Sequence, residues 1–309
     1  MGRRRKGRDV NGVVLLDKPA GWSSNQVLQK VRWLFQAKKA GHTGNLDPFA
    51  TGMLPICLGE ASKTAGFMLD ASKTYVATAR LGEATETGDI EGEICQTAPL
   101  PDLESPAIDA LLKSFEGDIE QVPPMYSALK HQGQPLYKLA RKGIVVERKR
   151  RTVTIHSLEL LSWKPPELVF RVHCSKGTYV RTLAEDIARA LNSCAHLRAL
   201  RREVVEPFDP QAMLTLEQLE HLKEQGTLDS ILQPVDAGLC TWTRVDIPPE
   251  LAVRFSNGNP VSVPEQSPQS AKSDPTMVRV YGPNNHLLGL AELTEAATLK
   301  PTRIMNLPT

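Results

Sequence analysis

Long apolar runs are absent from this sequence. No stretch approaches the roughly 20 consecutive apolar residues that a membrane-spanning helix needs, so we expect no membrane association. The basic N-terminus is followed by an apolar stretch that covers only Val13 to Leu16 and ends at Asp17-Lys18-Pro19, which is too short for a signal peptide. We therefore predict a globular, cytoplasmic protein.

Paired cysteines are also absent. The chain has five scattered cysteines and no C-x-x-C motif, a pattern that argues against a disulfide framework and against a thiolate zinc site. We expect reduced thiols. The sequence contains no Rossmann fingerprint, no P-loop and no cluster of metal-ligand residues, so neither a nucleotide cofactor nor a metal is indicated. No internal repeat is visible.

A strong net charge is missing as well. The formal net charge is +2 and the pI is about 8.2, too mild to indicate nucleic-acid binding by itself. Basic residues cluster locally, for example at Arg198 with Arg201-Arg202, and each cluster alone is interpreted as a solvated face. Residues 1–10 are predicted to form a basic flexible tail because they offer almost nothing to bury.

The remaining sequence predicts an α+β protein. A main domain is expected over residues 11–236 and a smaller one over 237–309, separated by the linker-like segment around Pro234. Apolar periodicity and capping residues predict strands over 13–16, 73–82, 152–160 and 168–174, helices from 23, 105, 178 and 215, and a hairpin over 277–293. The glycine-punctuated stretch 41–59 is predicted to be an ordered loop.

That stretch contains the most informative residues. Turn-forming residues surround Asp47, while Leu46, Phe49 and Met53 can anchor the segment in a core, an arrangement that can hold a carboxylate rigidly at the surface. For an isolated Asp-Pro dipeptide, an N-cap or an Asx-turn is the better interpretation. The dipeptide alone therefore does not establish a catalytic role for Asp47.

The wider segment resembles the G-H-x-G-x-L-D-P-x-A-x-G loop of the TruB-type tRNA pseudouridine synthases, with Asn45 where alanine is common. The resemblance continues, in the same order, through four further segments, at 16–24, 73–75, 121–130 and 174–183. It implies the pseudouridine-synthase fold, with a mixed, largely antiparallel sheet. The segments 278–281, 288–291 and 299–303 resemble a PUA-type RNA-binding β-barrel, with a generic β appendage as the alternative.

By this resemblance, the reaction is a rearrangement of one uridine that needs no cofactor. Asp47 is the catalytic carboxylate, acting either as a nucleophile or as a base at the ribose, and the sequence leaves both roles open. Arg181 matches the arginine that keeps this carboxylate ionised, and it can form a bidentate pair with it. Tyr75 matches the tyrosine that stacks on the extruded uracil.

Three further residues match positions that contact the nucleotide: His42, Tyr179 and Leu200. Without the resemblance, His42 is a turn histidine and the other two are core residues. The implied substrate is uridine 55 in the T-arm of tRNA, bound by a monomer without guide RNA. A guide-dependent pseudouridine synthase, a non-catalytic tRNA-binding protein and a glycoside hydrolase are alternatives. The last of these usually needs a second carboxylate, for which we find no candidate.

Overall fold

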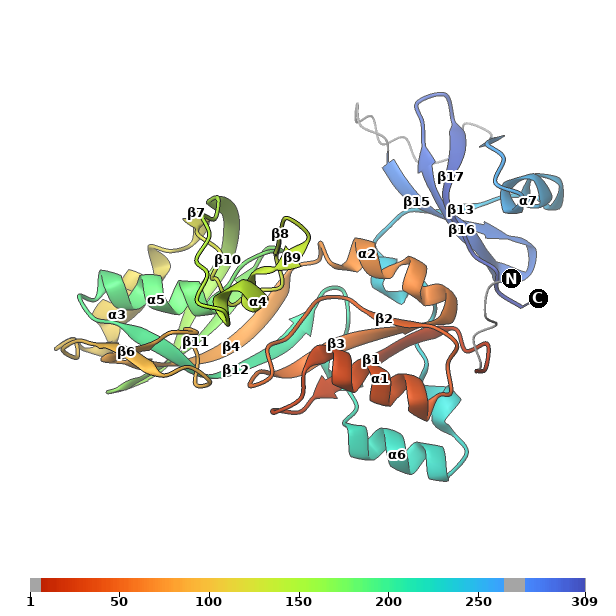
Figure 1. Ribbon diagram of the computed structural model, residues 1–309. Helices are drawn as coiled ribbons and strands as arrows, with labels where there is room; N and C mark the ends of the chain where they lie inside the picture. The colour runs from red at the N-terminus through yellow and green to blue at the C-terminus, as the bar shows by residue number, and fades with distance from the viewer. Residues whose placement is uncertain (1–6, 264–275, 309) are drawn as a thin grey trace.

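Two β-sheets organise the chain in the computed structural model (Figure 1). The structure describes residues 7–263 and 276–308. A long eight-stranded sheet forms the body, and a five-stranded sheet lies near one end of it. Within the described ranges, no helix combines the length and the apolarity that a membrane crossing requires.

The strands of the body are β1 Gly12–Lys18, β2 Ala40–His42, β3 Thr51–Leu58, β4 Lys73–Leu81, β7 Gly117–Gln121, β10 Arg151–Lys164, β11 Glu167–Cys174 and β12 Ala195–Val205. Short hairpins are formed by β5 Glu83–Thr85 with β6 Ile94–Thr97, and by β8 Lys130–His131 with β9 Gln134–Pro135. The second sheet contains β13 Arg244–Asp246, β14 Val261–Ser262, β15 Thr276–Gly282, β16 His286–Leu293 and β17 Thr298–Ile304. The helices are α1 Ser24–Leu34, α2 Ala65–Met68, α3 Ser105–Lys113, α4 Leu136–Ala140, α5 Val180–Ala190, α6 Leu216–Glu224 and α7 Pro249–Ser256.

The body sheet has the strand order β1-β3-β12-β4-β11-β10-β7, with β2 paired to β3. Only the β12–β3 pair is parallel, and it consists of Arg201 opposite Thr51 and Arg202 opposite Gly52. The other pairs are antiparallel, which confirms the prediction of a mixed, largely antiparallel sheet. This short parallel contact joins the two halves of the sheet.

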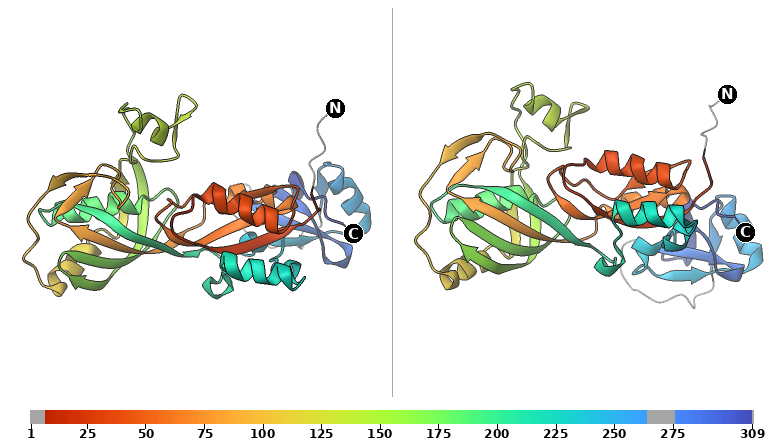
Figure 2. Two further views of the ribbon diagram at one scale, coloured as in Figure 1. Left: turned by 60° about the horizontal axis from the view of Figure 1, so that its bottom comes forward. Right: turned by 90° about the horizontal axis from the view of Figure 1, so that it is seen from below.

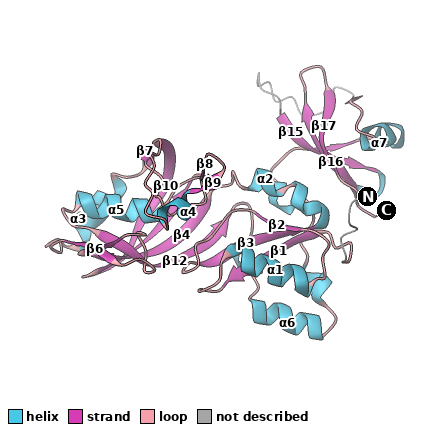
Figure 3. Cartoon of the chain, viewed as in Figure 1, coloured by secondary structure: helices cyan, strands magenta, loops and turns pink. Residues whose placement is uncertain are grey.

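Helices cover the sheet at two places (Figure 3). α3 and α5 pack on one half, whereas α1 and α6 pack against β1 and β3 on the other. α1 begins with the predicted capping box, in which Ser23 and Gln26 satisfy each other's backbone amides. α4 and its flanking loops stand away from the body (Figure 2).

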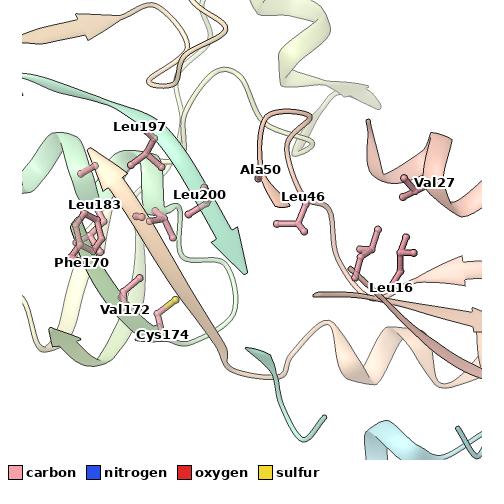
Figure 4. Packing of buried hydrophobic residues seen from close by; sticks show 14 of the residues in the cluster. Leu16, Val27, Leu46, Ala50, Phe170, Val172, Cys174, Leu183, Leu197 and Leu200 are labelled. Atoms are coloured by element: carbon pink, nitrogen blue, oxygen red, sulfur yellow. The ribbon is translucent and has the colours of Figure 1, made fainter. Parts of the chain in front are cut away.

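One large apolar core continues through both halves (Figure 4). It is supplied by the predicted alternating face of β4, where Ala77 and Ala79 are buried, and by the apolar stripe of α5. Leu46 and Ala50 of the 43–50 loop are buried in the same core, between the groups around Leu16 and Leu200. The loop is therefore anchored in the interior, as its apolar residues predicted.

The second sheet shares a separate core with the body. Tyr281, Leu287 and Leu290 pack in one cluster with Val13 and Met53 of the body sheet. Asp236, 4% exposed, accepts hydrogen bonds from the Tyr281 hydroxyl at 2.6 Å and from Arg279 Nη1 at 2.9 Å. The predicted hairpin is confirmed by the antiparallel pairing of β15 with β16.

Two predictions need correction. Residues 51–58 form strand β3 rather than the end of a loop; it is buried along nearly its whole length because β1 and β12 flank it. Of the predicted tail, residues 1–6 lie outside the described residues. Residues 7–10 pack on the body: the Arg8 amide bonds to the Gln36 carbonyl at 2.7 Å, and Val10 is buried.

Candidate active site

The loop that carries Asp47, residues 43–50, is fixed from three elements. The buried Ser24 of α1 donates to the Leu46 carbonyl at 2.9 Å and accepts from the Leu46 amide at 2.8 Å. Lys18 of β1 donates to the Pro48 carbonyl at 3.2 Å. Arg202 of β12 donates to the Asn45 carbonyl at 3.3 Å. The position of the carboxylate is therefore set by buried polar contacts on both sides of the loop.

Arg181 lies between two carboxylates. Its Nη2 lies 3.1 Å from Asp47 Oδ2, and its Nη1 lies 3.1 Å from Asp89 Oδ2. The side chains of Arg181 and Asp89 are 5% and 3% exposed, while that of Asp47 is 38% exposed. The guanidinium is thus shared between Asp89 and Asp47 instead of forming an exclusive bidentate pair with Asp47. Asp47 is the member of the group that a substrate can reach.

Backbone carbonyls complete the environment of Arg181. The Thr87 carbonyl accepts from Nη1 at 2.6 Å, and the Tyr126 carbonyl accepts from Nη2 at 2.6 Å. Tyr126 belongs to the segment that leads to α4. The guanidinium, which the first turn of α5 carries, is therefore held by segments far away in the chain, around Thr87 and Tyr126, so its orientation is fixed in the absence of RNA.

Burial raises the pKa of the Asp47 carboxyl above its ordinary value, and the Asp89 carboxylate acts in the same direction. The charges of Arg181 and Lys18 oppose this rise. The same burial lowers the pKa of Lys18 to about 8, although the Asp47 carboxylate acts to raise it. The two cations therefore oppose the protonation that burial favours at this carboxyl group.

Tyr75 lies on β4 at the same site. Burial raises the pKa of its hydroxyl above the ordinary value, and the Asp47 carboxylate adds to the rise, whereas the Arg202 guanidinium beside it lowers the pKa. The phenol is consequently neutral at physiological pH. A neutral, flat side chain next to the carboxylate is suited to stacking on a base.

The other residues predicted to contact the nucleotide lie on β2, at the start of α5 and on β12. His42 ends β2, and its Nδ1 accepts from the Gly44 amide at 3.4 Å, while burial lowers the pKa of its ring. Tyr179 is the N-cap of α5 and is held through both backbone groups by Gln121. Leu200 is 8% exposed and belongs to the main core. Substrate contact by these three residues stays a prediction.

The sequence did not indicate three groups of this site. Asp89 and Lys18 are buried beside the predicted residues, and Lys18 could have been noticed because a lysine that ends a buried strand must find partners. The prediction that Arg202 lies on a solvated face is wrong, because Arg202 is 1% exposed. Within the described ranges, no three side chains of His, Cys, Asp or Glu are arranged to hold a metal ion.

Comparisons with known proteins identify the family. Residues 32–180 match the TruB family pseudouridylate synthase N-terminal domain, residues 181–240 match the tRNA pseudouridylate synthase B C-terminal domain, and residues 243–305 match the pseudouridine synthase II TruB C-terminal domain. A protein of Nitrosococcus oceani named tRNA pseudouridine synthase B is 49% identical over 98% of this chain and 97% of its own length. A protein of Ectopseudomonas mendocina with the same name is 48% identical over 98% and 97%.

Solved structures share the fold at lower identity. An H/ACA RNP bound to a substrate RNA contains a chain that matches with a TM-score of 0.74 and 23% identity, covering 100% of this chain and 92% of that one. A Cbf5-Nop10-Gar1 complex gives a TM-score of 0.73 at 24% identity, covering 95% and 84%. These matches confirm the pseudouridine-synthase fold, and the curled second sheet is consistent with a PUA-like domain. The chain belongs to the TruB family of pseudouridylate synthases.

Proposed function

We propose that this protein isomerises uridine 55 in the T-arm of tRNA to pseudouridine, with Asp47 as the catalytic carboxylate. The observation that carries the proposal is the partly exposed Asp47 carboxylate 3.1 Å from the buried Arg181, whose other side is neutralised by Asp89. A charged carboxylate that a nucleotide can reach is what a reaction at ribose requires. The tRNA substrate is supported by the names of the two bacterial relatives.

The atoms of the reaction balance within one nucleotide. The bond between uracil N1 and ribose C1′ breaks, the base turns, and C5 bonds to C1′. The C5 proton is released to solvent and N1 takes up a proton, so the product has the composition of the substrate. Asp47 acts on the ribose, and Arg181 keeps it ionised against the effect of burial. Tyr75 stacks on the flipped base. His42, Tyr179 and Leu200 contact the nucleotide around it.

We assign residues 11–236 to catalysis and residues 237–309 to RNA binding. The buried cluster that joins Tyr281 and Leu290 to β1 and β3 supports a fixed mutual placement of the two regions. Such a placement lets the second sheet hold the RNA body while the 43–50 loop receives the flipped uridine. The protein acts as a monomer without a guide RNA.

The test uses purified protein and a tRNA transcript that carries tritium at C5 of its uridines. The wild-type protein is expected to release tritium in proportion to one uridine per transcript. A transcript with cytidine at position 55 is expected to bind without release. Asp47→Asn is expected to bind the transcript without releasing tritium, whereas Asp102→Asn, at an exposed aspartate outside the site, is expected to behave as wild type.

Each alternative predicts a different result. Release only after addition of a guide RNA and partner proteins would identify a guide-dependent enzyme. Binding with no release under any condition would identify a tRNA-binding protein, and free uracil in place of pseudouridine would identify a glycoside hydrolase. Normal release by Asp47→Asn would remove the carboxylate from the mechanism.

A further inference from the structure

We propose that Arg202 is a positioning residue for catalysis: its buried guanidinium ties both ends of the Asp47 loop to β12 and supplies the central positive charge beneath His42 and Tyr75. This inference rests on the proposed role of Asp47. It adds a residue that neither the motifs nor the chemistry above assign.

The contacts of Arg202 span the loop. Nη2 and Nη1 donate to the carbonyls of Gly44 and Asn45 at 3.5 and 3.3 Å, just before Asp47. Nε donates to the Met53 carbonyl at 2.7 Å, after the loop has entered β3. One rigid, planar group therefore fixes the distance between the segment that leads into the catalytic loop and the one that leaves it.

The backbone of Arg202 is fixed at the same place. Gly52 pairs with Arg202 in the short parallel contact between β3 and β12. A Cβ on Gly52 would lie 2.9 Å from the Arg202 backbone N and C atoms and closer still to its carbonyl oxygen. Glycine thus permits an approach that holds the Arg202 backbone against the strand that follows the Asp47 loop.

The charge of Arg202 is unusual in its setting. In the described part of the chain, no carboxylate forms an ion pair with it; its partners are the backbone carbonyls of the loop and of Met53 together with the Tyr75 hydroxyl. A buried arginine without an ion-pair partner costs stability, and an apolar side chain of similar volume would pack with less cost. Packing alone does not account for an arginine at this position.

The field of this charge reaches several groups around the site. Burial is the largest cause of the lowered pKa of His42, Lys18 and Lys73, and the Arg202 guanidinium lowers each of them further. It also lowers the pKa of the Tyr75 hydroxyl against the effect of burial. A neutral His42 leaves its Nδ1 free to accept from the Gly44 amide at the start of the loop. Geometry and charge therefore act on the same segment.

The experiment compares Arg202→Lys, Arg202→Met and the control Arg198→Gln. Arg198 lies on the same strand, and its side chain is 53% exposed and pairs with Glu167. For each variant we would measure the single-turnover rate of tritium release, the Kd for the transcript, thermal unfolding, and the pKa of His42 by NMR.

For Arg202→Met we expect the rate to fall about 10²-fold, the loss typical of a misplaced reacting group, with a change in Kd below about 5-fold. The pKa of His42 should rise. Arg202→Lys should restore the His42 pKa because it keeps the charge, yet recover only part of the rate because an ammonium lacks the planar fork. Arg198→Gln should match wild type in all four measurements.

A full wild-type rate in folded Arg202→Met, or a His42 pKa that is the same in all variants, would overturn the proposal. If the Met variant does not fold, the Lys variant decides: a full rate there refutes the role of the planar fork. If the wild-type protein itself released no tritium, the proposed function would fail, while the His42 titration would still test the charge of Arg202.

Discussion

The close approach of β3 and β12 at Gly52 gives a prediction that can be measured without any substrate. Gly52 has a φ of +101°, in the region that favours glycine. The Arg202 backbone occupies the place where a side chain of residue 52 would stand. Replacing Gly52 by Ala therefore combines two penalties. One is backbone strain at a positive φ, and the other is a collision with backbone that has no freedom to rotate away.

The two penalties can be separated by a matched control. Gly117 has a φ of +96° and no atom within 4 Å of the place where its Cβ would stand. Gly117→Ala therefore carries only the strain, about 1–2 kcal/mol. Gly52→Ala carries the same strain plus the cost of forcing extra atoms into a packed interior, about 1–3 kcal/mol. Its total cost is thus about 2–5 kcal/mol.

Urea unfolding of both variants beside wild type measures these costs. Gly52→Ala should have the lower midpoint, and it should also lose turnover because the strand pair supports the Asp47 loop. Gly117→Ala should keep full turnover. Equal loss of stability in the two variants would show that the β3–β12 contact yields easily, and it would refute the rigid approach on which this reasoning depends.

Three further predictions concern charge, docking and capping. Arg181→Met removes the cation that lowers the pKa of Asp47, so the acid limb of the pH–rate profile should move to higher pH. An unmoved limb would show that Arg181 does not control the ionisation of Asp47. Asp236→Ala removes the carboxylate that accepts from the buried Tyr281 hydroxyl and from the half-buried Arg279, and should cost about 3 kcal/mol in thermal unfolding. Tyr281→Phe should cost about 1 kcal/mol, and similar losses would contradict a charged network. Ser23→Ala should cost about 1 kcal/mol by urea unfolding, and no change would mean that the capping box is not populated in solution.

Much of the fold was accessible from the sequence because its elements obey local rules. The alternation in β4 and the capping residues of α1 and α6 each report on their immediate surroundings. β3 was missed for a physical reason. It lies between two strands and is buried on both faces, so it lacks alternation, and Pro55 within it argues against a strand.

The candidate site divides in the same way. The pairing of Asp47 with Arg181 was expected from the family resemblance, and the structure places the two side chains in contact. The placement of Asp89 and Arg202 depends on segments far apart in the chain: Arg202 bonds to carbonyls about 150 residues away, and Asp89 is 92 residues from Arg181. The spacing of residues along the sequence therefore cannot predict such contacts.

The apolar cluster that Tyr281, Leu287 and Leu290 share with Val13 and Met53 makes the C-terminal region unsuitable for removal. Truncation after residue 236 would expose the apolar side chains of β1 and β3 that pack in this cluster. β1 ends at Lys18, and β3 follows the Asp47 loop. An isolated catalytic fragment would then expose apolar side chains to solvent and would aggregate. The resulting loss of active protein would be mistaken for a catalytic defect. Engineering of this enzyme should begin with the intact chain.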